Sequence, residues 1–172
     1  KKIKTVLKGK GIEAHSFNAS LLREPWEVKT KKNEAYKVFT PFWRTLRSLG
    51  EPDPIKLAPK RIPAPSNFPE SDELDAWGLL PRGPDWASGL QDTWTPGEQA
   101  ANSRLQDFTE VAVLSYEDKR NFPGLSGTSR LSPHLHFGEI GPRQIWHSVV
   151  TRAVVQTGGP TPRGVETYLS EI

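Results

Sequence analysis

The stretch Gly127-Thr128-Ser129-Arg130-Leu131-Ser132-Pro133, followed by Gly138-Glu139-Ile140-Gly141-Pro142-Arg143, contains two helix-start signals close together. Ser132-Pro133 is typical of an N-cap with proline at the first helical position, and Gly141-Pro142 predicts a second start of this kind. Hydroxyl groups and a guanidinium precede the first start. Because a helix N-terminus presents unpaired N–H groups and a positive dipole end, these donors indicate a place suited to phosphate. The residues alone leave a second interpretation equally open, a capped helical corner with a solvated arginine.

The composition excludes several classes of protein. The chain has 172 residues, of which 35% are hydrophobic, a mean hydropathy of −0.58, and no Cys. The lack of Cys excludes disulfides and thiolate metal sites, and four His without ligand spacing predict no metal site. No apolar run approaches the roughly 20 residues of a membrane helix. We therefore expect a soluble, cytoplasmic protein without membrane contacts.

Charge divides the chain into three blocks. Residues 1–61 carry 15 Lys and Arg against 6 Asp and Glu, residues 62–118 carry 2 against 11, and residues 119–172 carry 6 against 3. Such blocks favour separate structural roles over one mixed surface. The sequence has no Met and starts inside a basic helical pattern, so we expect an internal piece of a longer protein.

The first block predicts the end of an α/β domain. A basic helix over 1–10, closed by Gly9 or Gly11, leads into Ile12–Phe17, which alternates like a strand. A helix that ends at Gly and feeds a strand is typical of a parallel α/β sheet. A short amphipathic helix over 41–49, with Thr40 as its cap, completes this part.

The rest of the chain predicts a linker and then helices only. Residues 50–94 hold eight of the sixteen prolines, which indicates an extended segment, while Trp77, Trp86 and Trp94 argue against a freely disordered tether. Beyond it, Thr95-Pro96-Gly97-Glu98 predicts a capping box. The helices that we expect there cover 96–114, 133–138, 142–156 with Gly158-Gly159 at its end, and a last one capped by Thr161-Pro162.

In this order, four segments resemble the DNA photolyase/cryptochrome family, and within it the class I-type deoxyribodipyrimidine photolyases. They are His15–Asn18 through Tyr36–Phe42, Tyr116 with Arg120-Asn121-Phe122-Pro123, Gly127–Arg143, and Tyr168–Ile172. The resemblance implies three parts. Residues 1–49 would be the end of a Rossmann-like parallel α/β domain, residues 50–94 a long Pro-rich linker, and residues 95–172 the start of an all-α FAD-binding domain.

The resemblance also implies a role for each matching residue. The expected FAD contacts are Tyr116, Thr128, Ser129, Arg130, Leu131, Ser132 and Tyr168, of which 128–132 would hold the pyrophosphate and ribityl region. Arg120 would contact a DNA phosphate. Glu171 would be catalytic, against the flipped pyrimidine pair, with Tyr168 beside it where the family usually has Trp.

These assignments imply a light-driven, FAD-dependent enzyme that splits cyclobutane pyrimidine dimers in damaged DNA by electron transfer from reduced flavin. The full-length protein would be a monomer with a second, antenna chromophore of folate or deazaflavin type, whose contacts lie outside this chain. The isolated chain would bind flavin weakly and be inactive. The alternative within the family is a cryptochrome-type blue-light receptor without repair activity.

Other interpretations stay open on the residues alone. A small basic nucleic-acid-binding module is disfavoured because the Trp-rich centre is acidic. Glu171 could be an ordinary surface residue and Tyr116 a core residue. We expect Arg143 to have a structural role at a helix start, and the three histidines of the last block, His134, His136 and His147, to be packing or surface residues.

Overall fold

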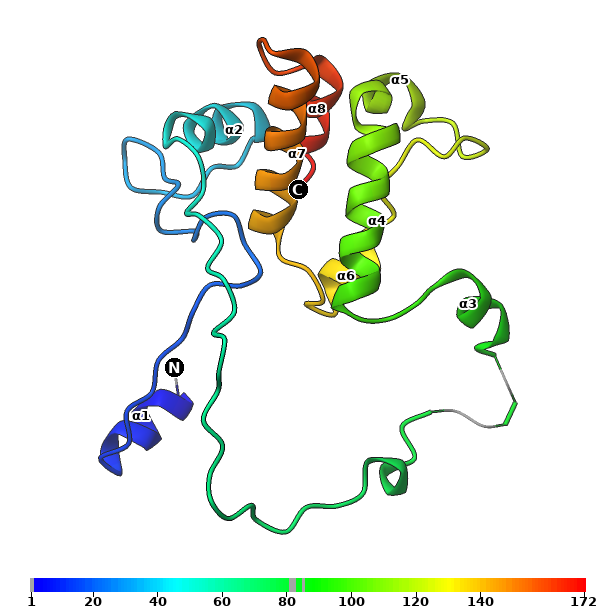
Figure 1. Cartoon of the computed structure of the whole chain (residues 1–172). Helices are drawn as coiled ribbons and strands as arrows, with labels where there is room; N and C mark the ends of the chain where they lie inside the picture. The colour runs from blue at the N-terminus through cyan, green and yellow to red at the C-terminus, as the bar shows by residue number, and fades with distance from the viewer. Residues whose placement is uncertain (1, 81–82, 85) are drawn as a thin grey trace.

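The computed structural model describes residues 2–80, 83–84 and 86–172, and every regular element in these ranges is helical (Figure 1). None of the described helices is long and apolar enough to cross a membrane. In chain order the elements are α1 (Lys2–Gly9), α2 (Phe39–Ser48), the 3-10 turn η1 (Leu74–Trp77), α3 (Ser88–Thr93), α4 (Glu98–Val111), the 3-10 turn η2 (Val113–Ser115), α5 (Tyr116–Lys119), α6 (Ser132–His136), α7 (Pro142–Thr157) and α8 (Arg163–Leu169).

The predicted α/β tail is wrong. Helix α1 ends at Gly9 as expected, with Lys1 outside the described residues, but residues 12–17 form no strand. A strand exists through hydrogen bonds to a neighbouring strand, and the described part of the chain contains no partner for it. Ile12 and Phe17 are accordingly 51% and 85% exposed. The alternation of apolar residues was therefore insufficient evidence for a sheet.

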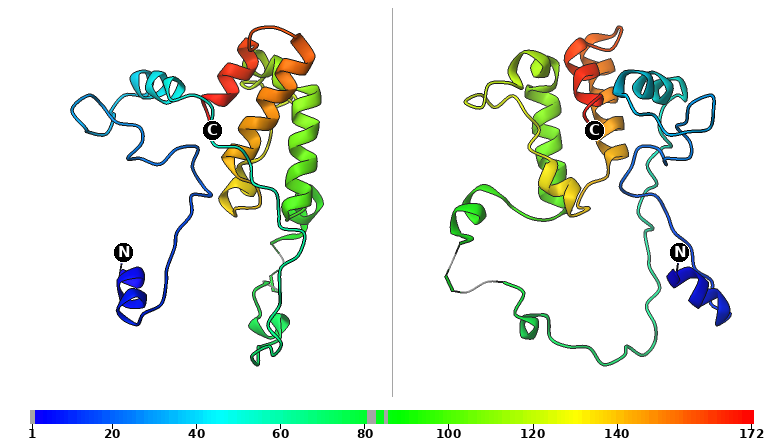
Figure 2. Two further views of the ribbon diagram at one scale, coloured as in Figure 1. Left: turned by 60° about the vertical axis from the view of Figure 1, so that its left-hand side comes forward. Right: turned by 180° about the vertical axis from the view of Figure 1, so that it is seen from behind.

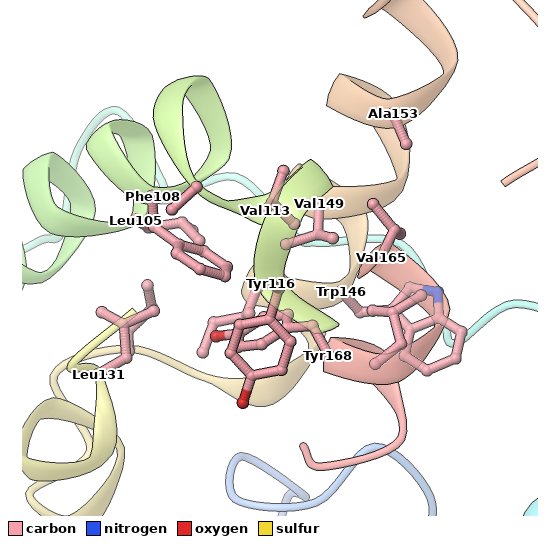
Figure 3. Close-up of a cluster of buried hydrophobic side chains, with 14 of the residues drawn as sticks. Leu105, Phe108, Val113, Tyr116, Leu131, Trp146, Val149, Ala153, Val165 and Tyr168 are labelled. Atoms are coloured by element: carbon pink, nitrogen blue, oxygen red, sulfur yellow. The ribbon is translucent and has the colours of Figure 1, made fainter. Parts of the chain in front are cut away.

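A continuous apolar core joins the helices of residues 98–172. Helices α4 and α7 lie side by side, and α8 packs against α7, α5 and η2 (Figure 1). The predicted spacing on α4 is confirmed, because Ala101, Leu105 and Phe108 are all buried. Figure 3 shows the Leu105 and Phe108 side chains in one cluster with those of α7 and α8, where Trp146 and Val165 are no more than 1% exposed.

The helix ends agree only partly with the predicted caps. The Gly141-Pro142 start is confirmed, and the Gln144 side chain accepts a hydrogen bond from the Gly141 N–H at 2.8 Å. The Thr95 capping box is wrong, because Gly97 has a φ of 110° that interrupts the helix, and α4 starts after it without a side-chain cap. Ser132 is the first residue of α6 and not its N-cap, which is Leu131.

The last predicted cap, Thr161, is also wrong. Pro162 is the N-cap of α8, and no side chain caps this helix. The end of α7 at Gly158 is confirmed, and this glycine has the left-handed conformation, with a φ of 58°, that commonly terminates a helix.

Two stretches before α4 differ in whether they pack against the helices. Residues 54–80 run away from the helices as an extended excursion that contains η1, and this wide loop is visible in every view (Figures 1 and 2). Residues 21–53 instead return to the helices, with Leu22, Val28 and Leu46 buried. Helix α2 lies next to α7, where Trp43 contacts Trp146 with ring centroids 6.1 Å apart.

Candidate functional site

Three of the residues singled out in the sequence meet around one carboxylate. The Tyr116 hydroxyl donates a hydrogen bond to Oε2 of Glu171, and the Arg120 guanidinium forms an ion pair with Oε1. Tyr116 is the first residue of α5, Arg120 follows that helix, and Glu171 follows α8. The side chains of Arg120 and Glu171 are 35% and 40% exposed, so both can be reached from solvent. The arrangement holds a carboxylate in a fixed orientation with a cation beside it.

A close approach of α8 makes this meeting possible. A Cβ atom at Gly164 would lie 2.4 Å from the carbonyl oxygen of Leu114 and 2.7 Å from that of Val113. Real Cβ atoms are not found so close to backbone, so only glycine lets α8 pack onto η2 at this distance. Gly164 was missed in the sequence because nothing around it signals a contact with a segment fifty residues earlier.

An aromatic wall of Phe108, Tyr116 and Tyr168 adjoins the carboxylate through Tyr116, and Figure 3 shows these three rings. The ring of Tyr168 lies 4.5 Å from that of Phe108 and 5.0 Å from that of Tyr116, centroid to centroid. Burial raises the pKa of Tyr168 to about 12, although a hydrogen bond with the Ser129 side chain acts in the opposite direction. Burial also raises the pKa of Tyr116, opposed by the charge of Arg120. Both phenols are therefore neutral near pH 7 and can donate hydrogen bonds.

The loop between α5 and α6 connects this wall to a polar hollow. Ser129 touches Tyr168, and together with Thr128 and Arg130 it lines a hollow of about 580 Å³ against α4. Arg130 has a φ of 53°, an uncommon conformation for a residue with a side chain. Gly127 allows the loop to lie against α5, since a Cβ there would be 2.5 Å from that of Lys119.

The lining of the hollow suits an anion. It carries two guanidiniums, from Arg104 and Arg130, and one carboxylate, from Asp107. Hydroxyl donors surround them, contributed by Thr95, Ser103, Ser126, Thr128 and Ser129. Guanidinium and hydroxyl groups are the usual partners of phosphate oxygens, so this donor set fits a phosphate-containing cofactor. Arg104 and Asp107 were missed because on an amphipathic helix they look like ordinary solvent-facing residues.

The structure separates the remaining predicted cofactor contacts from the hollow. Leu131 is 1% exposed and belongs to the apolar core. Ser132 is exposed at the start of α6 and does not line the hollow. The five predicted residues 128–132 therefore divide into three that face the hollow and two that do not.

A hydrogen-bonded pair of His134 and Glu139 lies against the start of α4, next to the hollow. His134 is buried, its Nδ1 lies 2.5 Å from Oε2 of Glu139, and its ring meets that of Trp94 at 6.2 Å. The hydrogen bond from His134, with a second from the Gly97 backbone, lowers the pKa of Glu139. No group of three or more metal-binding side chains occurs in the described ranges. His134 is thus a buried residue that pairs with Glu139 and packs on Trp94.

Comparison with known proteins extends these observations. The family model described as DNA photolyase matches residues 1–66. A deoxyribodipyrimidine photo-lyase of Agrobacterium fabrum is 45% identical over 86% of this chain and 31% of its own length. A protein of the same name from Synechococcus is 31% identical over 99% of this chain and 36% of its own length, and cryptochrome-1 of Arabidopsis thaliana is 32% identical over 95% and 24%.

A solved structure agrees with this similarity. The chain superposes on a bacterial class III photolyase from Agrobacterium tumefaciens with a TM-score of 0.90 and 39% identity, covering 99% of this chain and 34% of that one. The chain thus spans about a third of the length of the photolyases that it matches. These matches show that the chain belongs to the DNA photolyase/cryptochrome family.

Proposed function

We propose that the protein containing this chain is a light-driven, FAD-dependent deoxyribodipyrimidine photo-lyase, a carbon–carbon lyase that splits cyclobutane pyrimidine dimers. The observation that carries the proposal is the meeting of Tyr116, Arg120 and Glu171 beside an aromatic wall that Ser129 links to a phosphate-suited hollow. The photolyases among the relatives support it. Their class III neighbour favours that class over the class I-type that the motifs resemble.

The hollow is the proposed place of the cofactor phosphates. Membership of the family implies a flavin-type chromophore, and the donor set of Thr128, Ser129, Arg130 and Arg104 favours the dinucleotide FAD, whose pyrophosphate needs such donors. When bound in its reduced state, FAD supplies the electron that starts the repair of the dimer. A second chromophore of folate or deazaflavin type is proposed for the longer protein, with contacts outside this chain.

The group of Tyr116, Arg120 and Glu171 is the proposed place of the lesion. Arg120 brings a positive charge beside Glu171, where it can take a DNA phosphate, and the neutral hydroxyl of Tyr116 fixes the carboxyl group. When the Glu171 carboxyl group is protonated, it can donate a hydrogen bond to a carbonyl oxygen of the dimer and so stabilise the negative charge that develops there. Tyr168 gives the flipped pyrimidines and the flavin an apolar wall that excludes water.

The organisation of the longer protein is part of the same proposal. We assign residues 1–49 to the end of an N-terminal domain, 50–94 to a linker and 95–172 to a helical FAD-binding domain, with α2 touching the last of these. The protein would act on damaged DNA as a monomer with the pyrimidine dimer flipped out of the duplex. A cytoplasmic location stays a prediction.

The test is repair by the full-length protein. It is incubated with DNA that contains cyclobutane dimers, under blue light and in the dark, and the remaining dimers are counted. We expect light-dependent loss of dimers and a protein that retains flavin. Bound flavin without repair would favour the alternative, a cryptochrome-type receptor, for which the similarity to cryptochrome-1 is the specific observation. A protein that does not retain flavin would contradict both.

A further inference from the structure

The geometry points to Arg47 as a positioning residue that couples the docking of α2 to α8, the helix that carries Tyr168 and leads into Glu171. Its guanidinium lies 5.3 Å from the ring centroid of Trp146 and 5.8 Å from that of Trp43. The same group donates a hydrogen bond to Glu166 on α8 at 3.0 Å. Arg47 therefore connects α2, α7 and α8 through one planar cation.

The position of Glu166 on α8 explains why this contact matters for the site. Residues 166 and 168 are about 200° apart around a helix, so their side chains leave α8 on opposite sides. Tyr168 packs on Phe108 and Tyr116, whereas Glu166 reaches the guanidinium on the α2 side. Helix α8 is thus held from both sides, and Glu171 lies immediately beyond its end.

The contact is built more firmly than an ordinary surface ion pair. Trp146 is 1% exposed, and its indole N–H donates a hydrogen bond to Glu51, which follows α2. Arg23 donates to the backbone oxygen of the same Glu51 at 2.6 Å. The segment around α2 is thus fixed against α7, so the helix from which Arg47 reaches Glu166 is itself held in place.

This inference rests on the proposed function, since its readout includes repair by the site that α8 carries. Loss of Arg47 frees one side of α8 and lets Glu171 depart from its partners, without removing any group from the flavin hollow. The expected effect is on the yield of repair and not on the amount of bound flavin. A residue that merely stabilised the fold would lower both together.

The experiment compares Arg47→Ala with Arg44→Ala in the full-length protein. Arg44 lies on the same helix, is exposed, and forms no ion pair within the described residues. Repair is measured under limiting blue light at saturating dimer-containing DNA, with flavin content measured in parallel. We expect Arg47→Ala to lower the repair yield about three- to tenfold with flavin content unchanged, and Arg44→Ala to leave both unchanged.

Further variants separate positioning from stability. Glu166→Gln should reproduce the loss, and Arg47→Lys should restore part of it, because lysine keeps the charge but not the planar stacking. In a Glu171→Gln background, Arg47→Ala should add little, since its effect passes through that carboxylate. Additive losses, or equal repair by Arg47→Ala and the unchanged protein, would overturn the inference.

A second readout does not depend on repair. In an alkaline spectrophotometric titration, Arg47→Ala should let Tyr168 ionise at lower pH than in the unchanged protein, because α8 no longer holds the phenol in its buried place. Arg44→Ala should not. Unchanged titration in Arg47→Ala would refute the coupling even in a protein that repairs nothing, whereas absence of repair in the unchanged protein would refute only the proposed function.

Discussion

The helical region of residues 98–172 and the excursion of residues 54–80 use the same residue types to opposite effect. Trp146 in α7 is 1% exposed, whereas Trp77 in the excursion is 58% exposed. Trp146 has Ile145, Val149 and Ala153 at helical spacing around it, while Trp77 lies in a four-residue 3-10 turn without buried residues. The difference teaches that periodicity, rather than aromatic content, decides which side chains this chain buries.

The largest expected effect follows from that pair of tryptophans. Trp146→Ala removes a fully buried indole and its hydrogen bond, and should lower the free energy of unfolding by about 3–5 kcal/mol. Trp77→Ala is the matched control and should change it by less than about 0.5 kcal/mol. Urea denaturation followed by circular dichroism measures both. Similar losses for the two variants would break the comparison.

Two glycines offer a second contrast. Gly164→Ala places a Cβ 2.4 Å from a backbone oxygen that cannot move aside, so we expect a loss of about 3 kcal/mol in the free energy of unfolding. Gly89→Ala in α3 meets nothing within 4 Å and should be neutral or slightly stabilising. The same denaturation experiment decides. A tolerated alanine at Gly164 would mean that α8 does not approach η2 as closely as described.

Burial of Tyr168 in the helical region makes the free energy of unfolding depend on pH in the alkaline range. Its pKa rises from 10.0 to about 12 on burial, so the neutral phenol contributes stability that is fully present below pH 10 and is lost as the pH rises towards 12. The loss should reach about 2 kcal/mol by pH 12. Tyr168→Phe should remove this alkaline component in denaturation curves from pH 9 to 12. An identical decline in the variant would assign the effect elsewhere.

The smallest effect concerns the acid range. The His134 hydrogen bond lowers the pKa of Glu139 from 4.5, so its contribution to stability is present above that pH and is lost as the pH falls below it. Glu139→Gln should flatten the acid side of the stability profile slightly, and Glu73→Gln in the excursion is the matched control. If both variants keep the profile of the unchanged protein, the His134–Glu139 contact contributes nothing.

The sequence predicted the helices of residues 98–172 well because their signals are local. Apolar spacing located α4 and α7, and Gly141-Pro142 located the start of α7. The strand over 12–17 was wrong because alternation is a local signal, while a strand needs a partner elsewhere. Thr95 failed as a cap for a local reason, the positive φ of Gly97, which the sequence does not reveal.

The candidate site was only partly predictable. Resemblance to a family identified Tyr116, Arg120, Ser129 and Glu171. It did not indicate that the Glu171 carboxylate contacts both Tyr116 and Arg120. Gly164 and Arg47 depend on contacts between segments far apart in the chain, which no local pattern encodes. For this reason the residues that hold α8 in place were found only in the structure.

The central claim is that Ser129 and Arg130 belong to a clamp for the phosphates of FAD, and flavin binding by the full-length protein tests it most directly. The apoprotein is titrated with FAD and with riboflavin, which has no phosphate, and dissociation constants are compared for the unchanged protein, the Ser129→Ala/Arg130→Ala double variant, and Arg61→Ala as a control in the excursion. We predict that the double variant binds FAD at least about tenfold more weakly and riboflavin equally well. Equal FAD affinity in the double variant, or an equal loss for both ligands, would contradict the account.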